Sequence, residues 1–336
     1  MKKNFLPLVF VTAFSLTACG GKSYNPSDYI VGTLPYRDGF KILQLTDIHM
    51  SDKDDQDLHY AFMDKLIREA KEDPDHTGQV DFMVVTGDLF TFASRDTAKR
   101  LFKFLDSYDI PWTVVFGNHD EQTYFPVDWM TGYLNGLNDK RLSNPDSSYC
   151  YFKDLQDDKV QGNCNFAINI VDGTTVKKQL ILMDSNRYYF GSYMGYDYFK
   201  KDQIDWYESM VKETPVDSLM FYHIPLFEIN EAYEKGARVF DGRNGNDGKR
   251  EDCCPPKENS GFFSKITELG HTKAMFFGHD HINTFEVDYQ GVKFCYGIKS
   301  TDRIYYDEDL LGYQTISLDG SDITVRRYWH TYAEVK

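Results

Sequence analysis

The sequence predicts an α/β fold for most of its 336 residues. Short, nearly continuous apolar runs recur along the chain, as expected of strands that are buried on both faces. Segments with helical periodicity separate these runs, and an alternation of strands and helices is typical of an α/β architecture. Aromatic residues make up 16% of the chain, which is enough packable surface to exclude extensive disorder.

The expected strands are short, and several end in polar residues. They span residues 41–46, 82–86, 112–116, 165–171, 179–183, 218–222 and 274–277. The expected helices span residues 57–71, 96–106, 201–213 and 261–269. Pro74 and Pro111 lie just beyond two of these helices, where a helix is expected to have ended. The last part of the chain is different, because its alternating runs predict an antiparallel meander over 284–289, 292–296, 313–318 and 322–328.

The N-terminal end of the chain has the features of an export signal. Two lysines precede an apolar run that is too short to span a membrane, and small residues follow it. These features predict a signal peptide over residues 1–18. The segment from Leu16 to Cys19 resembles the bacterial lipoprotein box, which implies cleavage before Cys19 and acylation of its thiol. An ordinary signal peptide with an incidental cysteine is the alternative.

A polar segment with two prolines follows the predicted lipidation site. We expect residues 19–39 to contain the lipidated Cys19 and a tether, and residues 40–336 to form the folded domain. The lipid is the expected attachment to a membrane, since no later apolar run is long enough to span one. The predicted location is therefore the bacterial cell envelope, at the outer membrane or the periplasmic face.

The charge of the chain limits its partners. The formal net charge is -15, and no run of lysine or arginine forms a basic stripe. A nucleic-acid backbone would be repelled, so we expect no nucleic-acid partner. An anionic phosphate ester would be repelled as well unless the site supplied local positive charge. Bound metal ions are the most direct source of that charge.

Five of the predicted strand ends carry residues that bind metals. They are Asp47-Ile48-His49, Gly87-Asp88, Gly117-Asn118-His119-Asp120, His223 and Gly278-His279-Asp280-His281. Ligands bind at the carboxyl ends of strands in α/β sheets, and carboxylates, imidazoles and an amide oxygen suit Mn, Zn or Fe(II). Each motif alone also fits a turn or a structural histidine. Five of them in order, each directly after a strand, favour a metal site with two ions about 3.5 to 4 Å apart.

These five blocks, in this order, resemble the calcineurin-like metallophosphoesterase superfamily over residues 41–296. The resemblance implies a four-layer α-β-β-α sandwich with two mixed β-sheets, and a metallophosphoesterase domain over residues 40–336. Within the superfamily, the chain resembles the purple acid phosphatase-related branch, which includes the yeast cell-cycle phosphatase and plant homologues called inactive. The segments that carry this resemblance are Lys41-Ile42-Leu43-Gln44, Tyr222-His223-Ile224-Pro225-Leu226, Cys253-Cys254-Pro255, Asn259-Ser260-Gly261 and Gly278-His279-Asp280-His281-Ile282-Asn283.

The resemblance also implies the metal ligands. The residues expected to bind one ion are Asp47, His49, Asp88 and His281. Asp88 would bridge to a second ion, whose other ligands are Asn118, His223 and His279. True purple enzymes have an iron(III)-binding tyrosine where this chain has Thr91, and glycine where it has His49. We therefore expect a colourless site with two divalent ions, for which Mn, Zn and Fe are the candidates.

The predicted reaction is hydrolysis of phosphomonoesters or phosphodiesters. A bridging hydroxide would attack phosphorus in line, while the two ions neutralise the phosphoryl oxygens. His119 would stabilise charge or protonate the leaving alkoxide, and Asp120 would orient His119. A non-catalytic metal-binding protein is the alternative. Loss of a ligand or of His119 would favour that alternative, and neither is lost.

Fewer residues point to the substrate. Arg187, Lys299 and Arg303 are candidate phosphate contacts, although lysine and arginine mostly lie on solvated surfaces. Tyr188 belongs to an aromatic stretch over 187–198, which is predicted to be a loop. Its rings either form a stacking wall for a substrate or pack on one another, and we favour the second reading. A small phosphate ester is the expected partner, with a phosphoprotein as the alternative.

Overall fold

The computed structural model describes residues 24–72, 78–155, 160–192, 194–239 and 247–336. The predicted signal peptide and Cys19 lie outside these residues, so their prediction stands on the sequence alone. Within the described ranges, no helix has the length and apolar character needed to cross a membrane.

Two large sheets form the centre of the molecule. The order of the eight-stranded sheet is β1 (Ile30–Pro35), β5 (Phe166–Asp172), β6 (Thr175–Leu182), β9 (Ser218–Phe221), β11 (Thr272–Phe277), β13 (Val292–Tyr296), β12 (Glu286–Tyr289) and β10 (Ala237–Val239). The order of the five-stranded sheet is β15 (Asp322–His330), β14 (Leu311–Asp319), β2 (Phe40–Leu45), β3 (Phe82–Thr86) and β4 (Trp112–Val115). Both sheets contain parallel and antiparallel pairs, which confirms the predicted mixed α/β fold.

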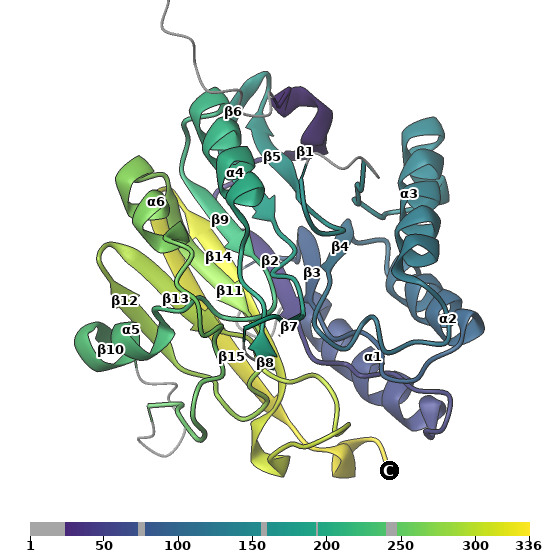
Figure 1. Cartoon of the computed structure of the whole chain (residues 1–336). Coiled ribbons are helices and arrows are strands. Elements are labelled where there is room, and N and C mark those ends of the chain that lie inside the picture. The colour runs from purple at the N-terminus through teal and green to yellow at the C-terminus, as the bar shows by residue number, and fades with distance from the viewer. Residues whose placement is uncertain (1–23, 73–77, 156–159, 193, 240–246) are drawn as a thin grey trace, which may run out of the picture.

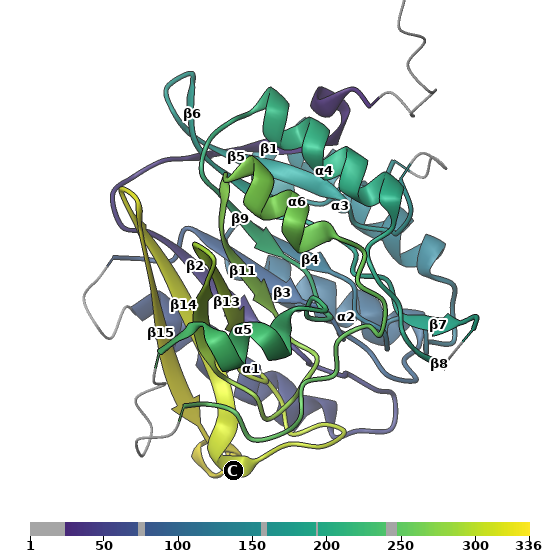
Figure 2. The same cartoon turned by 60° about the vertical axis from the view of Figure 1, so that its left-hand side comes forward.

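Helices cover the outer faces of the two sheets, as Figures 1 and 2 show. Those on the side of the five-stranded sheet are α1 (Gln56–Glu72), α2 (Arg95–Asp106) and α3 (Val127–Ser143). Those on the side of the eight-stranded sheet are α4 (Lys201–Glu213), α5 (Ile229–Lys235) and α6 (Phe262–Leu269). The result is a helix, sheet, sheet, helix sandwich.

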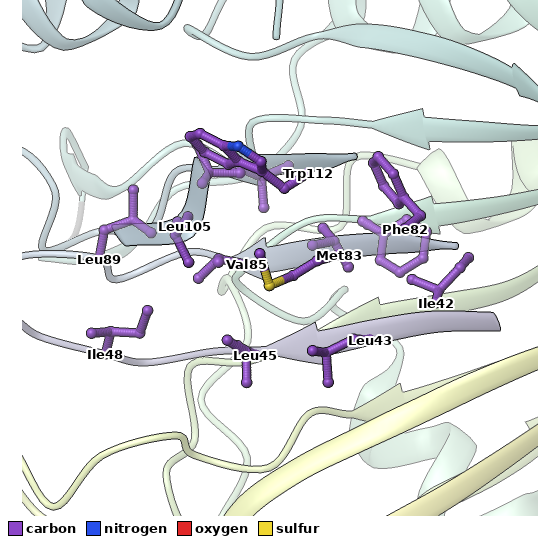
Figure 3. Close-up of a cluster of buried hydrophobic side chains, with 14 of the residues drawn as sticks. Ile42, Leu43, Leu45, Ile48, Phe82, Met83, Val85, Leu89, Leu105 and Trp112 are labelled. Carbon is purple, nitrogen blue, oxygen red and sulfur yellow. The ribbon is translucent and has the colours of Figure 1, made fainter. Parts of the chain in front are cut away.

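Alternate side chains of the central strands serve two different cores. On β9 and β11, Phe221 and Phe276 point into the core shared by the two sheets. Their neighbours Met220 and Met275 point the other way, into the core beneath α4 and α6. This alternation follows from the two-residue period of a strand. Figure 3 shows part of the first core, where side chains of β2 and β3 pack together.

The predicted strands and helices are found within a few residues of their expected bounds, but several segments differ, and α5 and β10 were not predicted. Residues 30–35 fall in the expected tether, yet they form β1 and pair in parallel with β5. The predicted meander is wrong as one unit, because β12 and β13 belong to one sheet while β14 and β15 belong to the other. The helix α3 was not predicted, since Gly132 and Gly136 weaken its helical signal and the apolar side chain of Leu142 is exposed.

Removing one ring from the core between the sheets should be costly. The rings of Phe221 and Phe276 stack with centroids 5.3 Å apart, and both side chains are fully buried. We expect Phe276→Ala to lower the free energy of unfolding by about 3–5 kcal/mol in guanidinium titrations. Leu142→Ala, at a 62% exposed position, is the matched control and should stay within about 0.5 kcal/mol of wild type. Equal stability of the two variants would contradict the assigned core.

Candidate metal centre

All seven predicted metal ligands gather where strands from both sheets end. Asp47 and His49 follow β2, and the loops after β3, β4, β9 and β11 supply the others. Every one of these side chains is buried. The ligands come from positions up to 234 residues apart, so only the packing of the two sheets brings them together. The residues that the structure assembles are Asp47, His49, Asp88, Asn118, His223, His279 and His281.

The first group of ligands forms a compact cluster. One ligand atom from each of Asp47, His49, Asp88 and His281 lies within 4.8 Å of the others. The Nε2 atoms of His49 and His281 face each other at 2.9 Å. The Nδ1 atoms of the same two rings have partners of their own. His49 Nδ1 lies 2.9 Å from Thr91 Oγ1, and His281 Nδ1 donates a hydrogen bond to the Tyr305 carbonyl at 2.8 Å. Contacts of this kind orient imidazoles toward a metal.

The second group leaves polar atoms without hydrogen bonds. His223 Nδ1 donates to the Thr86 carbonyl at 2.8 Å, which directs its Nε2 inward. Several buried side-chain atoms in the described part of the chain have no hydrogen-bond partner, and three of them belong to this group: Asn118 Oδ1, His223 Nε2 and His279 Nε2. A buried polar atom without a partner is costly and uncommon. An ion coordinated by these three atoms would satisfy all of them, so the residues fit the second metal position.

Asp88 lies between the two groups. Its Oδ2 is 3.6 Å from His49 Nε2 and 3.1 Å from His223 Nε2. Its Oδ1 accepts a hydrogen bond from the backbone N–H of His119 at 2.8 Å. This position fits the bridging role that the family resemblance implies for Asp88.

The backbone that carries the ligands is strained. Asp47, His49, Asp88 and His279 have φ angles of 54°, 50°, 51° and 83°, in the left-handed region that side chains seldom adopt. Each residue in this conformation costs on the order of 1–3 kcal/mol, and the conformation persists only because the surrounding structure enforces it. Strain of this kind concentrates at functional sites, because the required placement of a side chain there outweighs the energetic cost to the backbone.

Two glycines of the strand-end motifs are required by close approach. A Cβ atom on Gly117 would overlap the Asp88 carboxylate, and one on Gly278 would overlap Thr46 Oγ1 and the Asp47 carboxylate. Gly117 precedes Asn118 and Gly278 precedes His279 in the sequence. The glycines therefore let neighbouring ligand loops approach each other closely.

Charge is concentrated in this buried space. Burial opposes ionisation of Asp88, but the facing His223 imidazole holds the pKa of that carboxyl well below its usual value. Burial likewise favours neutral His223, yet Asp88 overrides it and raises the pKa of His223 to about 10. Burial lowers the pKa of His279 to about 3, with His223 adding to the effect. Without a metal, His223 therefore holds the proton that balances Asp88.

His119 is at the edge of this centre, and its expected partner is a different residue. The His119 ring lies 5.0 Å from that of His49, centroid to centroid, and it is partly exposed. Its Nδ1 lies 2.8 Å from Gln122 Oε1. Asp120 instead accepts hydrogen bonds from the backbone N–H groups of Gly117 at 2.7 Å and Phe90 at 3.1 Å. Gln122, and not Asp120 as predicted, is therefore the residue that contacts the His119 ring, while Asp120 joins the loop after β4 to the loop after β3.

The predicted cationic substrate contacts are engaged elsewhere. Lys299 is buried, and its Nζ donates to the backbone carbonyl of Asp47 at 2.8 Å. Arg303 pairs with Asp54 at 2.5 Å, and Arg187 pairs with Glu121.

The predicted aromatic loop contains a short hairpin of β7 (Tyr188–Phe190) and β8 (Met194–Tyr196). Its rings pack on one another, with Tyr188 and Tyr196 stacked 5.7 Å apart. The hairpin also contacts the centre, since Tyr188 Oη accepts a hydrogen bond from Asn118 Nδ2 at 2.9 Å and the Tyr196 ring lies 4.3 Å from that of His279. The favoured interpretation, in which the rings pack on one another, agrees with these contacts, and the stacking wall for a substrate stays a prediction.

Sequence reasoning missed the residues that orient the ligands. Thr91, Gln122 and the carbonyl groups of Thr86 and Tyr305 all hold imidazoles in place. Backbone carbonyls carry no sequence signal, and threonine and glutamine are too common to stand out. Only the position of Thr91, three residues after Asp88, offered a clue.

Comparison with known proteins gives consistent results. A model of the family described as "Calcineurin-like phosphoesterase" matches residues 40–283. The chain is 29% identical over 297 residues to "Probable inactive purple acid phosphatase 29" of Arabidopsis thaliana, covering 77% of this chain and 71% of that protein. It is 26% identical over 309 residues to "Probable inactive purple acid phosphatase 28" of the same plant, covering 79% and 71%. These matches confirm the predicted resemblance to the superfamily and to its purple acid phosphatase-related branch.

Among solved structures, the chain resembles a dimetal phosphatase from Danio rerio. The TM-score is 0.52 at 13% sequence identity, and the match covers 88% of this chain and 100% of that one. At this identity the likeness concerns the fold alone.

Loss of the contact behind His49 should weaken metal binding. We expect Thr91→Val to lower Mn²⁺ affinity about 10- to 100-fold, because the His49 ring loses the hydrogen bond that orients it. Isothermal titration of metal-free protein measures this. Thr113→Val is the matched control, since the Thr113 hydroxyl is buried without a hydrogen-bond partner in the described chain. An unchanged affinity in Thr91→Val would count against the assigned ligand geometry.

Metal binding should also depend on pH in a defined direction. Because Asp88 raises the pKa of His223 to about 10, the imidazole is protonated at neutral pH and its proton competes with the ion. Mn²⁺ affinity should therefore rise from about pH 6 to about pH 9, with about one proton released per protein from His223. Titrations in two buffers of different ionisation enthalpy report that release. Equal affinity across this range, without proton release, would contradict the His223 assignment.

Proposed function

The chain belongs to the calcineurin-like phosphoesterase family, and from that premise we propose that it is an active metal-dependent hydrolase of phosphate esters. The observation that carries this proposal is the buried assembly of both ligand groups around Asp88, with His119 at its edge. The names of the plant relatives contain the word "inactive", which describes those proteins and does not decide the activity of this chain. In this chain the ligand positions and His119 are all filled by residues able to perform their roles.

The proposed chemistry divides between cofactor and chain. Two divalent ions, when bound, would supply an acidified water as nucleophile and polarise the phosphoryl oxygens. Asp47 and Asp88 provide the anionic charge that holds the ions, and Asn118 and the histidines complete the ligand set. With its Nδ1 fixed by Gln122, His119 presents Nε2 to stabilise the departing oxygen or to give it a proton.

A non-catalytic metal-binding protein is the competing function, and the names of the plant relatives favour it. It would need neither His119 nor the Gln122 contact that fixes the imidazole. The retention of both, on a partly exposed ring beside the ligands, favours the enzyme.

The setting of the reaction is also a proposal. We infer that the enzyme is exported and anchored through a lipid on Cys19, which rests on the sequence pattern of residues 1–19. Its substrate would then be a small phosphate ester outside the cytoplasm, or a phosphoprotein as the alternative. The net charge of -15 disfavours nucleic acid.

Replacing His119 should separate catalysis from metal binding. The wild-type protein loaded with Mn²⁺ or Zn²⁺ should hydrolyse p-nitrophenyl phosphate or its bis-ester. We expect His119→Ala to lower kcat by about 10²- to 10⁴-fold while the bound metal, measured by elemental analysis, stays the same. His271→Ala, outside the centre, is the control and should keep wild-type turnover. Full turnover in His119→Ala, or none in wild type with either metal, would refute the proposed function.

A further inference from the structure

Exposed apolar side chains are concentrated around the metal centre. Of ten large hydrophobic residues that are exposed in the described chain, seven lie in four segments next to it. The exposed aromatic residues of these segments are Phe92, Tyr124, Phe190, Tyr305 and Tyr306, which we call the aromatic rim. Scattered exposed hydrophobic residues need no explanation, but their accumulation around one site does.

Each part of the rim is joined to a residue of the centre. Tyr305 stacks on the His281 ring at 4.1 Å, and the Phe190 ring lies 6.1 Å from that of Tyr188, which is bonded to Asn118. Figure 2 shows the hairpin that carries Phe190 projecting from the body. The rim therefore borders the centre on several sides.

The remaining two segments border the centre at His119. The backbone N–H of Phe92 donates to the carbonyl of Gln122 at 2.8 Å, and that of Tyr124 donates to the carbonyl of Ala93 at 3.0 Å. Gln122 is the residue that contacts His119. The exposed rings of Phe92 and Tyr124 therefore belong to the two loops that position His119, the proposed proton donor.

Two residues beside the centre have a strained backbone although their side chains are exposed and gain little from packing. Phe92 has a φ of 54° and Ile304 has a φ of 68°, although they are 51% and 50% exposed. The left-handed region is unfavourable for a bulky side chain and most unfavourable for a β-branched one. Half-exposed side chains recover little of this cost by packing, which indicates that their outward position serves a purpose.

The cations near the centre are already paired. Arg303 pairs with Asp54, Arg187 with Glu121, and Lys299 donates to the Asp47 carbonyl. In the same region Arg250 lies 3.9 Å from Asp307, and Lys257 donates to the carbonyl of Met194 at 3.1 Å. A phosphomonoester carries a charge of about -1.5 to -2 at neutral pH and is usually clamped by arginine or lysine. A phosphodiester carries only about half that charge and needs less of such a clamp.

We propose that the substrate is a phosphodiester with an aromatic or apolar substituent that packs on the aromatic rim. This inference rests on the proposed function and specifies its substrate class. Water would add its oxygen to phosphorus, the P–O bond to one substituent would break, and that substituent would leave as an alcohol or phenol with a proton. The product is a phosphomonoester with one more negative charge.

The choice of ester tests the inference in the metal-loaded protein. We expect kcat/KM for bis(p-nitrophenyl) phosphate to exceed that for p-nitrophenyl phosphate by at least about tenfold, because the diester has less charge and a second ring on the rim. Methyl p-nitrophenyl phosphate, a diester with one ring, should fall between them. A monoester that is hydrolysed as well as the bis-aryl diester would overturn the inference and leave the proposed function intact.

Rim variants test the role of the rings. Phe190→Ser and Phe92→Asn should each lower kcat/KM for the bis-aryl diester about three- to tenfold and lower that for the monoester by a smaller factor, because the monoester has only one ring. Asparagine is chosen at position 92 because it tolerates a left-handed backbone. Leu142→Ser removes an exposed apolar side chain on α3 and should alter neither substrate. A loss of equal size for both substrates in the rim variants would overturn the inference.

Binding gives a readout that does not depend on turnover. By titration calorimetry, diphenyl phosphate should bind the metal-loaded protein more tightly than inorganic phosphate, and Phe190→Ser should reduce that difference. If no ester is hydrolysed, the proposed function fails, and this binding comparison still decides whether the rim recognises aryl diesters. Equal or weaker binding of diphenyl phosphate would overturn the inference.

Discussion

The interaction on which the site depends is the buried contact between the carboxylates of Asp47 and Asp88 and the imidazoles that face them. Asp47 Oδ1 lies within 4.0 Å of the Nε2 atoms of His49, His223 and His281. Two buried anions would repel each other strongly unless positive charge lay between them. In the metal-free protein the proton on His223 provides part of that charge. Divalent ions would provide it more completely, and the carboxylate and imidazole ligands suit them.

The fold maintains this arrangement through contacts between the two sheets. Lys299 lies in the segment after β13 of the eight-stranded sheet, and it forms backbone bridges with Thr46 and Leu311 of the five-stranded sheet's segments, while its ammonium group donates to the Asp47 carbonyl. Burial lowers the pKa of Lys299 to about 8, so its charge is costly to keep there. Its placement is best understood as structural, since it fixes the loop that presents Asp47. The glycines before Asn118 and His279 then allow the remaining loops to close on that position.

The surroundings of the centre combine an acidic body with paired cations and exposed rings. We proposed on this basis that the site prefers a phosphodiester with an apolar substituent. Phe92 and Ile304, which are half exposed, have the same left-handed backbone as the ligands Asp47 and His49. The same kind of strain thus accompanies both the proposed chemistry and the proposed selectivity.

The sequence by itself determined the α/β class and the positions of most strands and helices, and it predicted which residues would bind the metals. It did so because buried strands leave continuous apolar runs, and ligand types recur directly after them, as in Gly278-His279-Asp280-His281. Helix α3 was not predicted because Gly132 and Gly136 weaken its helical signal. Strand β1 was not predicted because it is an edge strand, Ile30–Pro35, in which buried and exposed positions alternate only weakly.

Only the tertiary structure decided which groups orient the ligands and what the nearby cations do. The carbonyls of Thr86 and Tyr305 bind imidazoles through backbone atoms that every residue possesses, so no residue type could reveal them. Gln122 rather than Asp120 contacts His119, because both oxygens of the Asp120 carboxylate accept backbone N–H groups of adjacent loops. Lys299, Arg303 and Arg187 looked available in the sequence, and the carbonyl and carboxylates that engage them lie 66 to 252 positions away. Contacts over such separations are set by how the sheets and loops pack, which local sequence does not encode.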